Sequence, residues 1–197
     1  MALKKSGYTE KTSNNYLVDA AVVYTGVTFD EEGSTFTGTL HGATSGGVSV
    51  LIEQTYRDIE VDGTSHTRIK GNKVLESAIA TATVNLKEIT AESIKQSLNG
   101  AIAESAENAP GGYKEITTKR YVEDTDYIAN MAIVGKLSGS QEPVIIILDN
   151  VLSTGGMEIA KEDNGEAVIE QTFEAHATHE QLEDDEFPWR ILYPTVV

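Results

Sequence analysis

The chain has 197 residues, of which 40% are apolar and 23% charged, so it is long enough for one domain with a proper hydrophobic core. Its formal net charge of −16 argues against a protein that holds nucleic acid through the phosphates, because such binding needs clustered Lys and Arg. The absence of cysteine excludes disulfides, thiolate nucleophiles and cysteine metal sites.

The first 15 residues are polar and aperiodic, and they contain no apolar stretch of the kind that a signal peptide requires. We interpret residues 1–15 as a flexible N-terminal arm that becomes ordered only where it docks. Its lysines, Lys4, Lys5 and Lys11, would either keep the arm soluble or pair with an acidic patch of a neighbouring copy. Residues 16–197 are predicted to form a single domain, and no apolar run in them approaches the ~20 residues of a membrane span.

The stretch 48–61 is predicted to be a strand that changes face. Its apolar residues occupy one parity up to Ile52 and the other parity from Ile59, which predicts a β-bulge or bend near 53–58. Asp62-Gly63 then predicts a turn.

The most regular pattern lies just beyond. Residues 77–89 alternate between apolar and polar, as a strand with one wet face does. Thr90 is a suitable N-cap for a helix over 91–98, and Asn99-Gly100 is a plausible C-cap. Because the apolar face of the strand carries small alanines, we expect this helix to cover it.

The other predicted elements are strands. Asn164-Gly165 indicates a hairpin, because this dipeptide favours a type I′ turn. The overall pattern indicates a mainly β fold, a β-sandwich or open barrel of about eight strands with one flanking α-helix. The remaining strands are predicted at 16–28, 113–122, 127–136, 144–148, 157–161 and 167–178, with short ones at 34–40 and before the C-terminus.

The titratable residues form no recognisable catalytic or metal-binding pattern. His176 and His179 are three apart in a stretch that we interpret as a strand, where they would face opposite sides, whereas a zinc helix needs a spacing of four. The acidic run 180–186 lacks the Gly that a calcium loop needs.

Asp58, Glu60 and Asp62 share a strand parity, but nothing in the sequence supplies the cleft in which paired carboxylates do acid/base work. There is no G-x-S-x-G nucleophile elbow and no phosphate-binding loop. We therefore expect no enzyme, no cofactor and no metal.

The order of turns, alternating strand and capped helix between residues 57 and 98 resembles the major tail tube proteins of long-tailed bacteriophages and related prophages. A second segment, 173–194, resembles the closing strand, acidic turn and Pro-aromatic finish of that family. Together the two segments cover about half the chain. The matching residues of the first segment are Val61, Asp62, Gly63, Lys70, Gly71, Asn72, Glu76, Ser77, Ala78, Lys87, Glu88, Ile89 and Thr90, followed by the helix around Ile94 and Leu98.

The resemblance implies a structural virion protein with a tail-tube-like β-sandwich. Six copies would close into a ring, and rings would stack into a tail tube that conducts DNA during ejection. At −16 for each of six copies, a ring would carry 6 × −16 = −96 formal charges, so DNA would slide through without specific binding. The implied partners are other copies of the chain and the tape measure, tail terminator and tip proteins. Such a protein would be assembled in the bacterial host cytoplasm and end in the virion tail, with no membrane contact.

Two alternatives remain open. One is the tube protein of a contractile injection machine or type VI secretion system, which has a similar fold and ring. The other is a carbohydrate-binding or adhesin-like β-sandwich, which would expose aromatic residues on one face; the chain has one Trp but eight Tyr.

The connection between Asp62 and Lys73 differs from the scaffold around it. It combines two Gly breaks with mixed charge and almost no apolar residues, so we expect it to be mobile in a lone subunit and to become ordered on a neighbour. The predicted subunit-contact residues are Asp62, Gly63, Thr64, Ser65, His66, Thr67, Arg68, Lys70 and Asn72.

Overall fold

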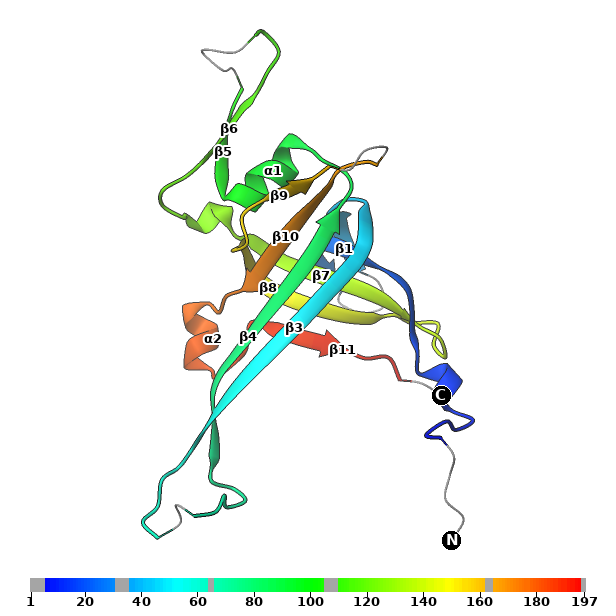
Figure 1. Ribbon diagram of the computed structural model, residues 1–197, viewed down its shortest axis with the longest axis vertical. Helices are drawn as coiled ribbons and strands as arrows, with labels where there is room; N and C mark the ends of the chain where they lie inside the picture. The colour runs from blue at the N-terminus through cyan, green and yellow to red at the C-terminus, as the bar shows by residue number, and fades with distance from the viewer. Residues whose placement is uncertain (1–5, 31–35, 64–65, 105–109, 162–164, 196–197) are drawn as a thin grey trace.

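The computed structural model describes residues 6–30, 36–63, 66–104, 110–161 and 165–195. Within these ranges the fold is mainly β, with eleven strands, two short α-helices and two 3-10 turns (Figure 1). No helix of the described chain is long and apolar enough to cross a membrane. The strands are β1 (Leu17–Phe29), β2 (Phe36–Leu40), β3 (Thr44–Asp58), β4 (Lys73–Leu86), β5 (Gly100–Ala103), β6 (Glu115–Thr118), β7 (Ile128–Leu137), β8 (Val144–Ser153), β9 (Glu158–Ala160), β10 (Val168–Ala175) and β11 (Trp189–Leu192); the helices are α1 (Ala91–Leu98), α2 (His179–Glu183), η1 (Thr12–Asn14) and η2 (Asp124–Asp126).

Nine strands form one antiparallel sheet in the order β2-β1-β7-β8-β10-β4-β3, with β11 also paired to β8 and β9 to β10. β5 and β6 form a separate two-stranded sheet. In Figure 1 the strands β10, β4 and β3 cross in front of β1, β7, β8 and β11. The large sheet therefore folds over on itself, which agrees with the predicted β-sandwich or open barrel; the strands beyond the expected eight are short.

The sheet divides at Asp149. Its backbone N–H donates to Pro188 O on the β11 side (2.8 Å), and its carbonyl accepts from His176 N on the β10 side (3.2 Å). Asn150 follows with a left-handed backbone (φ 46°), and its side-chain amide donates to His176 O at 3.0 Å. The first half of β8 thus serves β11 and the second half β10, which starts the two layers of the sandwich.

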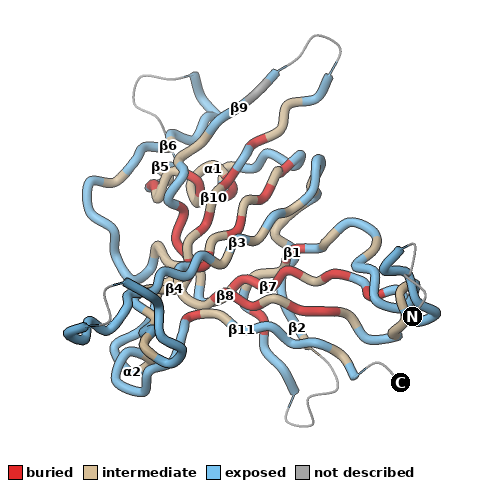
Figure 2. The backbone as a smooth tube through the Cα atoms, turned by 60° about the horizontal axis from the view of Figure 1, so that its bottom comes forward, coloured by how far each residue is buried: buried red, intermediate tan, exposed pale blue. Residues whose placement is uncertain are grey.

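The core lies between the crossing layers (Figure 2). The inward face of β4 is fully buried at Ala82 and Val84, as the alternation predicts, and it packs with Val23, Met131 and Phe173 of β1, β7 and β10. The prediction that α1 covers this alanine face is wrong, because strands of the opposite layer occupy it. α1 packs instead on β5, β6 and β8.

Several local predictions are confirmed. Thr90 and Ser93 form a reciprocal capping box at the start of α1, and Asn99 ends the helix with a left-handed backbone. The bulge predicted near 53–58 is also present: Thr55 pairs with Ser77 and the next residue pairs with Leu75, so that Glu76 of β4 is the extra residue. The register of the sheet is therefore shifted where the β3–β4 hairpin leaves the body.

Two other predictions need correction. Residues around His179 were expected to continue a strand into an acidic turn, but Thr178 caps a short helix, α2, with its side chain accepting from Gln181 N. The strand expected to reach residue 61, β3, ends instead at Asp58.

The hairpin expected around Asn164-Gly165 has paired strands: β9 and β10 are antiparallel neighbours, with Ala160 opposite Val168. Asn164 of the expected tight turn lies outside the described residues.

Part of the N-terminal arm is described. η1 is attached to the turn after β7: the Ser138 hydroxyl donates to Ser13 O (2.6 Å) and accepts from Tyr16 N (3.1 Å). The division into an arm and one domain stays a prediction.

Candidate functional site

The predicted contact connection lies at the end of a long hairpin. β3 and β4 stay paired from Thr44 and Leu86 to Asp58 and Lys73, and Figure 1 shows the hairpin projecting well beyond the crossing layers. Since the pairing is nearly continuous, the connection is carried away from the body of its own chain.

The base of this tip is closed by hydrogen bonds and ion pairs. Ile59 N donates to Asn72 O at 2.7 Å, and the Asn72 side chain donates to Ile59 O at 3.4 Å. The Asp58 carboxylate contacts Lys73 Nζ (3.0 Å) and Arg68 Nη1 (3.7 Å). The hydrogen bond from Lys73, with the positive charges of Lys73 and Arg68, holds the pKa of Asp58 below its ordinary value.

Every described residue from 59 to 71 is exposed. The apolar side chains among them are Ile59 (44% exposed), Val61 (52%) and Ile69 (45%). Positive φ angles at Gly63 (+85°) and Gly71 (+94°) match the two predicted breaks. Described residues of the tip line an open hollow of about 820 Å³.

The structure brings together most of the predicted contact residues. Lys70 lies in the second turn of the tip, and Thr64 and Ser65 lie outside the described residues. The remaining six line the hollow: Asp62, Gly63, His66, Thr67, Arg68 and Asn72. The tip is therefore a coherent, exposed unit, and its contact with a neighbour stays a prediction.

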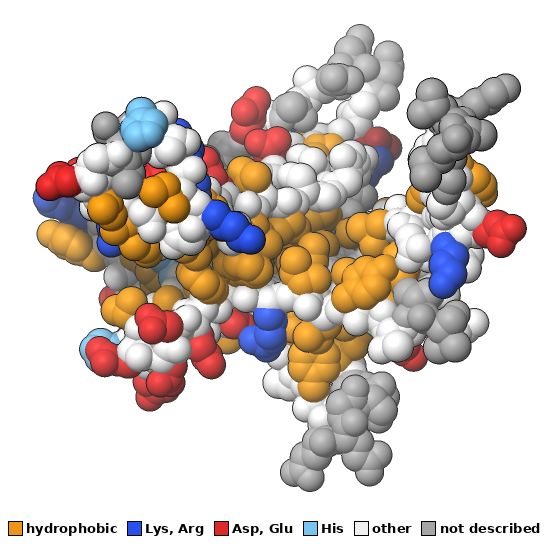
Figure 3. Space-filling view, turned by 90° about the horizontal axis from the view of Figure 1, so that it is seen from below, with side chains coloured by type: hydrophobic (Ala, Val, Ile, Leu, Met, Phe, Trp, Pro, Cys, Tyr) orange, Lys and Arg blue, Asp and Glu red, His pale blue; other side chains and the backbone are white. Residues whose placement is uncertain are grey.

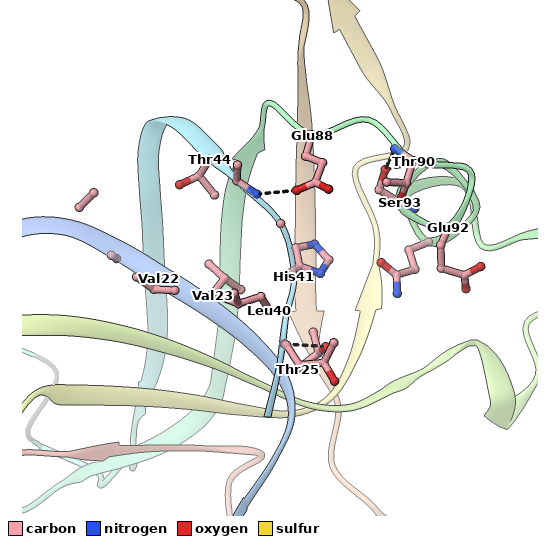
Figure 4. A pocket seen from close by; sticks show the side chains of 16 residues that line it. Val22, Val23, Thr25, Leu40, His41, Thr44, Glu88, Thr90, Glu92 and Ser93 are labelled. Atoms are coloured by element: carbon pink, nitrogen blue, oxygen red, sulfur yellow. Dashed lines mark hydrogen bonds between the residues drawn. The ribbon is translucent and has the colours of Figure 1, made fainter. Parts of the chain in front are cut away.

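A second site, which no sequence pattern indicated, is a pocket of about 710 Å³ bordered by β1, the connection from β2 to β3 and the start of α1 (Figure 4). Its apolar side chains include Val22 and Leu40, and its polar ones include His41, Glu88 and Glu92. Figure 4 shows Glu88 directed from the segment after β4 toward His41.

Gln171 of β10 joins this pocket to the core. It is fully buried, and its amide nitrogen donates to Ser93 O (2.8 Å) and to the Ser97 hydroxyl. Its carbonyl oxygen lies 2.9 Å from His41 Nε2. Because both nitrogen contacts are on the α1 side, the oxygen must accept, and His41 Nε2 carries the hydrogen.

The same network attaches α1 to the sheet. The Ser97 hydroxyl donates to Ser93 O (2.8 Å), and the Ser153 hydroxyl of β8 donates to Ser97 O (3.0 Å). The buried residues of α1 are thus two serines rather than the apolar Ile94 and Leu98, which are half-buried. One signal was available: Gln171 is polar and shares the inward parity of Ile169 and Phe173.

His41 is held in its neutral form. Burial lowers the pKa of the imidazole below its ordinary value, and the hydrogen bond with Gln171 only partly offsets this. The ring also meets Phe173 edge to face at 5.4 Å. At neutral pH, Nδ1 is therefore an unprotonated acceptor, and among the described residues no hydrogen bond to it is found.

The other candidate ligands do not converge. His176 lies edge to face with Tyr127 at 5.3 Å, whereas His179 starts α2 and lies 3.8 Å from Glu183. No group of three His, Asp or Glu able to hold a metal ion is found in the described part of the chain.

No family model and no curated protein sequence matches this chain. Among solved structures, it is similar to a chain in the six-fold symmetrised cryo-EM structure of the anti-feeding prophage baseplate. The match covers 92% of this chain and 97% of that one, at 11% identity and a TM-score of 0.47. At that level of similarity, the functional proposal has to rest on the residues of this chain.

Proposed function

We propose that this chain is a structural, non-catalytic component of a phage-tail-like particle, and specifically that it is a tail tube subunit. Copies associate head to tail into hexameric rings, and the rings stack into a tube. A heterologous contact that closes makes a ring, and a second contact along the axis makes a tube.

The observation that carries the proposal is the projecting hairpin. A tip of which every described residue from 59 to 71 is exposed contributes no buried side chain to its own core. It nevertheless presents Ile59, Val61 and Ile69 together with charged residues, the mixture of apolar centre and polar rim found at protein interfaces. A second copy that receives the tip would bury this surface.

Sheet edges support the same proposal. The described sheet ends at β2 on one side and β3 on the other, and both are open edges. Exposed apolar residues such as Leu51 of β3 and Ile191 of β11 add to the surface that another copy would cover. Figure 3 shows hydrophobic side chains gathered in a band across the face seen from below.

The charge suits a conduit. Each copy carries a formal charge of −16, so a lumen wall built from six copies repels phosphates instead of binding them. In this proposal DNA passes through the tube without specific contacts, the tape measure and the terminator or tip proteins are the other partners, and the protein ends in the virion tail.

The tube protein of a contractile injection machine would use the same contacts. The genes next to the one for this chain distinguish the two particles. A neighbouring tape-measure gene of a long-tailed phage favours the phage tail tube, and a secretion or injection operon favours the contractile injection machine.

The proposal is tested by shortening the tip. Because Ile59 and Asn72 are hydrogen-bonded neighbours, residues 60–71 can be replaced by Asn-Gly, which forms a two-residue hairpin turn. Sedimentation velocity over a concentration series should show association of the parent protein that the shortened protein has lost. At a concentration where the parent protein is monomeric, the two melting temperatures should be close, because the described tip residues are all exposed and the lost Arg68–Asp58 ion pair is a surface one.

A matched pair of point variants supplies the control. Ile69→Ser in the tip should weaken association, whereas Leu182→Ser on α2, equally apolar and 68% exposed, should not. Association that survives removal of the tip, or a parent protein that stays monomeric at every concentration, would overturn the proposal.

A further inference from the structure

The His41 pocket has a composition that selects one kind of ligand. Its charged lining residues are Glu88 and Glu92, and no Lys or Arg among the described residues lines it. Gln171 hydrogen-bonds two of the lining residues, His41 and Ser93, so its polar atoms are already engaged. The charged groups of the lining are therefore both hydrogen-bond acceptors, while Gln96 and Thr44 add neutral side chains that can donate or accept.

Glu88 and His41 are the acceptors with spare capacity. Glu92 already pairs with Lys95 at 3.0 Å, whereas the one hydrogen bond that Glu88 is seen to accept within the described chain is a long one of 3.4 Å from Ala43 N. His41 Nδ1 is unprotonated because the network with Gln171 places the hydrogen on Nε2. In Figure 4 both side chains lie in the same part of the pocket.

We propose that this pocket binds a primary alkylammonium group. The ammonium donates to the Glu88 carboxylate and to His41 Nδ1, and the aliphatic chain lies along Val22 and Leu40. A charge-assisted hydrogen bond to the carboxylate supplies most of the selectivity, and the apolar wall accepts the methylene groups. The volume of about 710 Å³ is ample for such a group.

Two sources offer this chemistry: a free aliphatic amine, and the end of a lysine side chain from another copy. The lysine source rests on the self-association proposed above, and the free amine does not. The N-terminal arm is the lysine-rich candidate, with Lys4, Lys5 and Lys11 in the first 11 residues. η1 of the same chain is attached to the turn after β7 through Ser138, which does not line the pocket, and we therefore take the arm of a second copy as the lysine source.

The test uses n-butylamine on the full chain, with NMR of the His41 imidazole and the Ala43 amide at neutral pH. Both signals should shift saturably with n-butylamine and not with 1-butanol, which has the same chain without the charge. Glu88→Gln should weaken binding about tenfold, as loss of a charge-assisted hydrogen bond does. Glu170→Gln, the same change on the exposed face of β10, should leave binding unaltered.

The coupling between amine binding and protonation of His41 gives a second measurement, the pKa of His41 with and without n-butylamine. A merely structural role of Glu88 would not make this pKa depend on the amine. Because the bound cation and a protonated His41 exclude one another, n-butylamine should lower the pKa of His41 further, and acidification should weaken binding. The charged groups of the pocket that bear on this titration are Glu88 and Glu92. An equal response to 1-butanol, a shift that never saturates, or equal binding by the two glutamate variants would overturn the proposal.

A variant with Lys4, Lys5 and Lys11 changed to Gln identifies the source. If the His41 signal of the parent protein depends on protein concentration and that of the variant does not, the ligand is a lysine of a second copy. If both proteins behave alike and bind n-butylamine, the site serves a free amine. If the parent protein does not self-associate but still binds n-butylamine, the tube proposal is refuted and the amine site is not.

Discussion

Replacing Gln171 by Leu tests whether the buried polar network holds α1 and the His41 pocket in place. The side chain is fully buried and makes three hydrogen bonds, to Ser93 O, to the Ser97 hydroxyl and to His41 Nε2. At about 1 kcal/mol each, their loss costs about 3 kcal/mol, and the stranded His41 N–H adds roughly 1–2 kcal/mol. Burial of the leucine side chain returns about 2 kcal/mol, so the expected net loss is about 2–3 kcal/mol.

The assay is urea unfolding followed by the fluorescence of Trp189, the only tryptophan of the chain. Its ring packs against the core and stacks on Phe187 at 6.0 Å, so its emission reports the folded sandwich. Gln141→Leu, at an exposed position in the turn after β7, is the matched control and should be neutral. Equal stability of the two variants would refute the view that the network matters to the fold.

Two further predictions concern stability. Because the pKa of His41 is lower in the folded chain than its ordinary value of 6.5, the unfolded chain binds the proton first as the pH falls. The contribution of His41 to stability is thus complete above pH 6.5 and is lost as the pH drops through the folded pKa; urea unfolding between pH 8 and 5 should show this for the parent protein and not for His41→Asn. Thr90→Ala removes the capping oxygen that accepts from Ser93 N and should cost about 1 kcal/mol by the same assay, with Thr90→Ser restoring most of it; an unchanged midpoint for Thr90→Ala would contradict the assigned cap.

The parts of the fold that the sequence predicted are those set by local rules. Alternation predicted the buried face of β4, and the Thr90 cap marked the start of α1. The irregularity expected at 53–58 is present as a register shift after Thr55, but its extra residue, Glu76, belongs to β4. Each of these depends on residues close together in the chain, where period, cap chemistry and turn chemistry act directly.

The remaining features depend on contacts between distant segments. The alanine face of β4 pointed to a close neighbour, but small side chains do not say which element that neighbour is, and β1 and β7 occupy it rather than α1. The division of β8 at Asp149 follows from two strands that arrive from elsewhere in the chain. α2 was hidden because its five residues are too few to show a helical period.

The candidate sites show the same contrast. Composition alone singled out the connection after Asp62, because it is polar, charged and broken by Gly. The His41 pocket was missed because His41 and Gln171 are 130 residues apart and neither belongs to a motif. Only the inward parity of a polar residue on β10 hinted at a buried network.

The central claim is that copies of this chain build a tube by themselves. Negative-stain electron microscopy of concentrated protein tests it most directly. The proposal predicts rings and hollow tubes with six-fold symmetry, absent when residues 60–71 are replaced by Asn-Gly. Single, unassociated particles of the parent protein at every concentration, even with tape-measure or tail-tip proteins added, would contradict it.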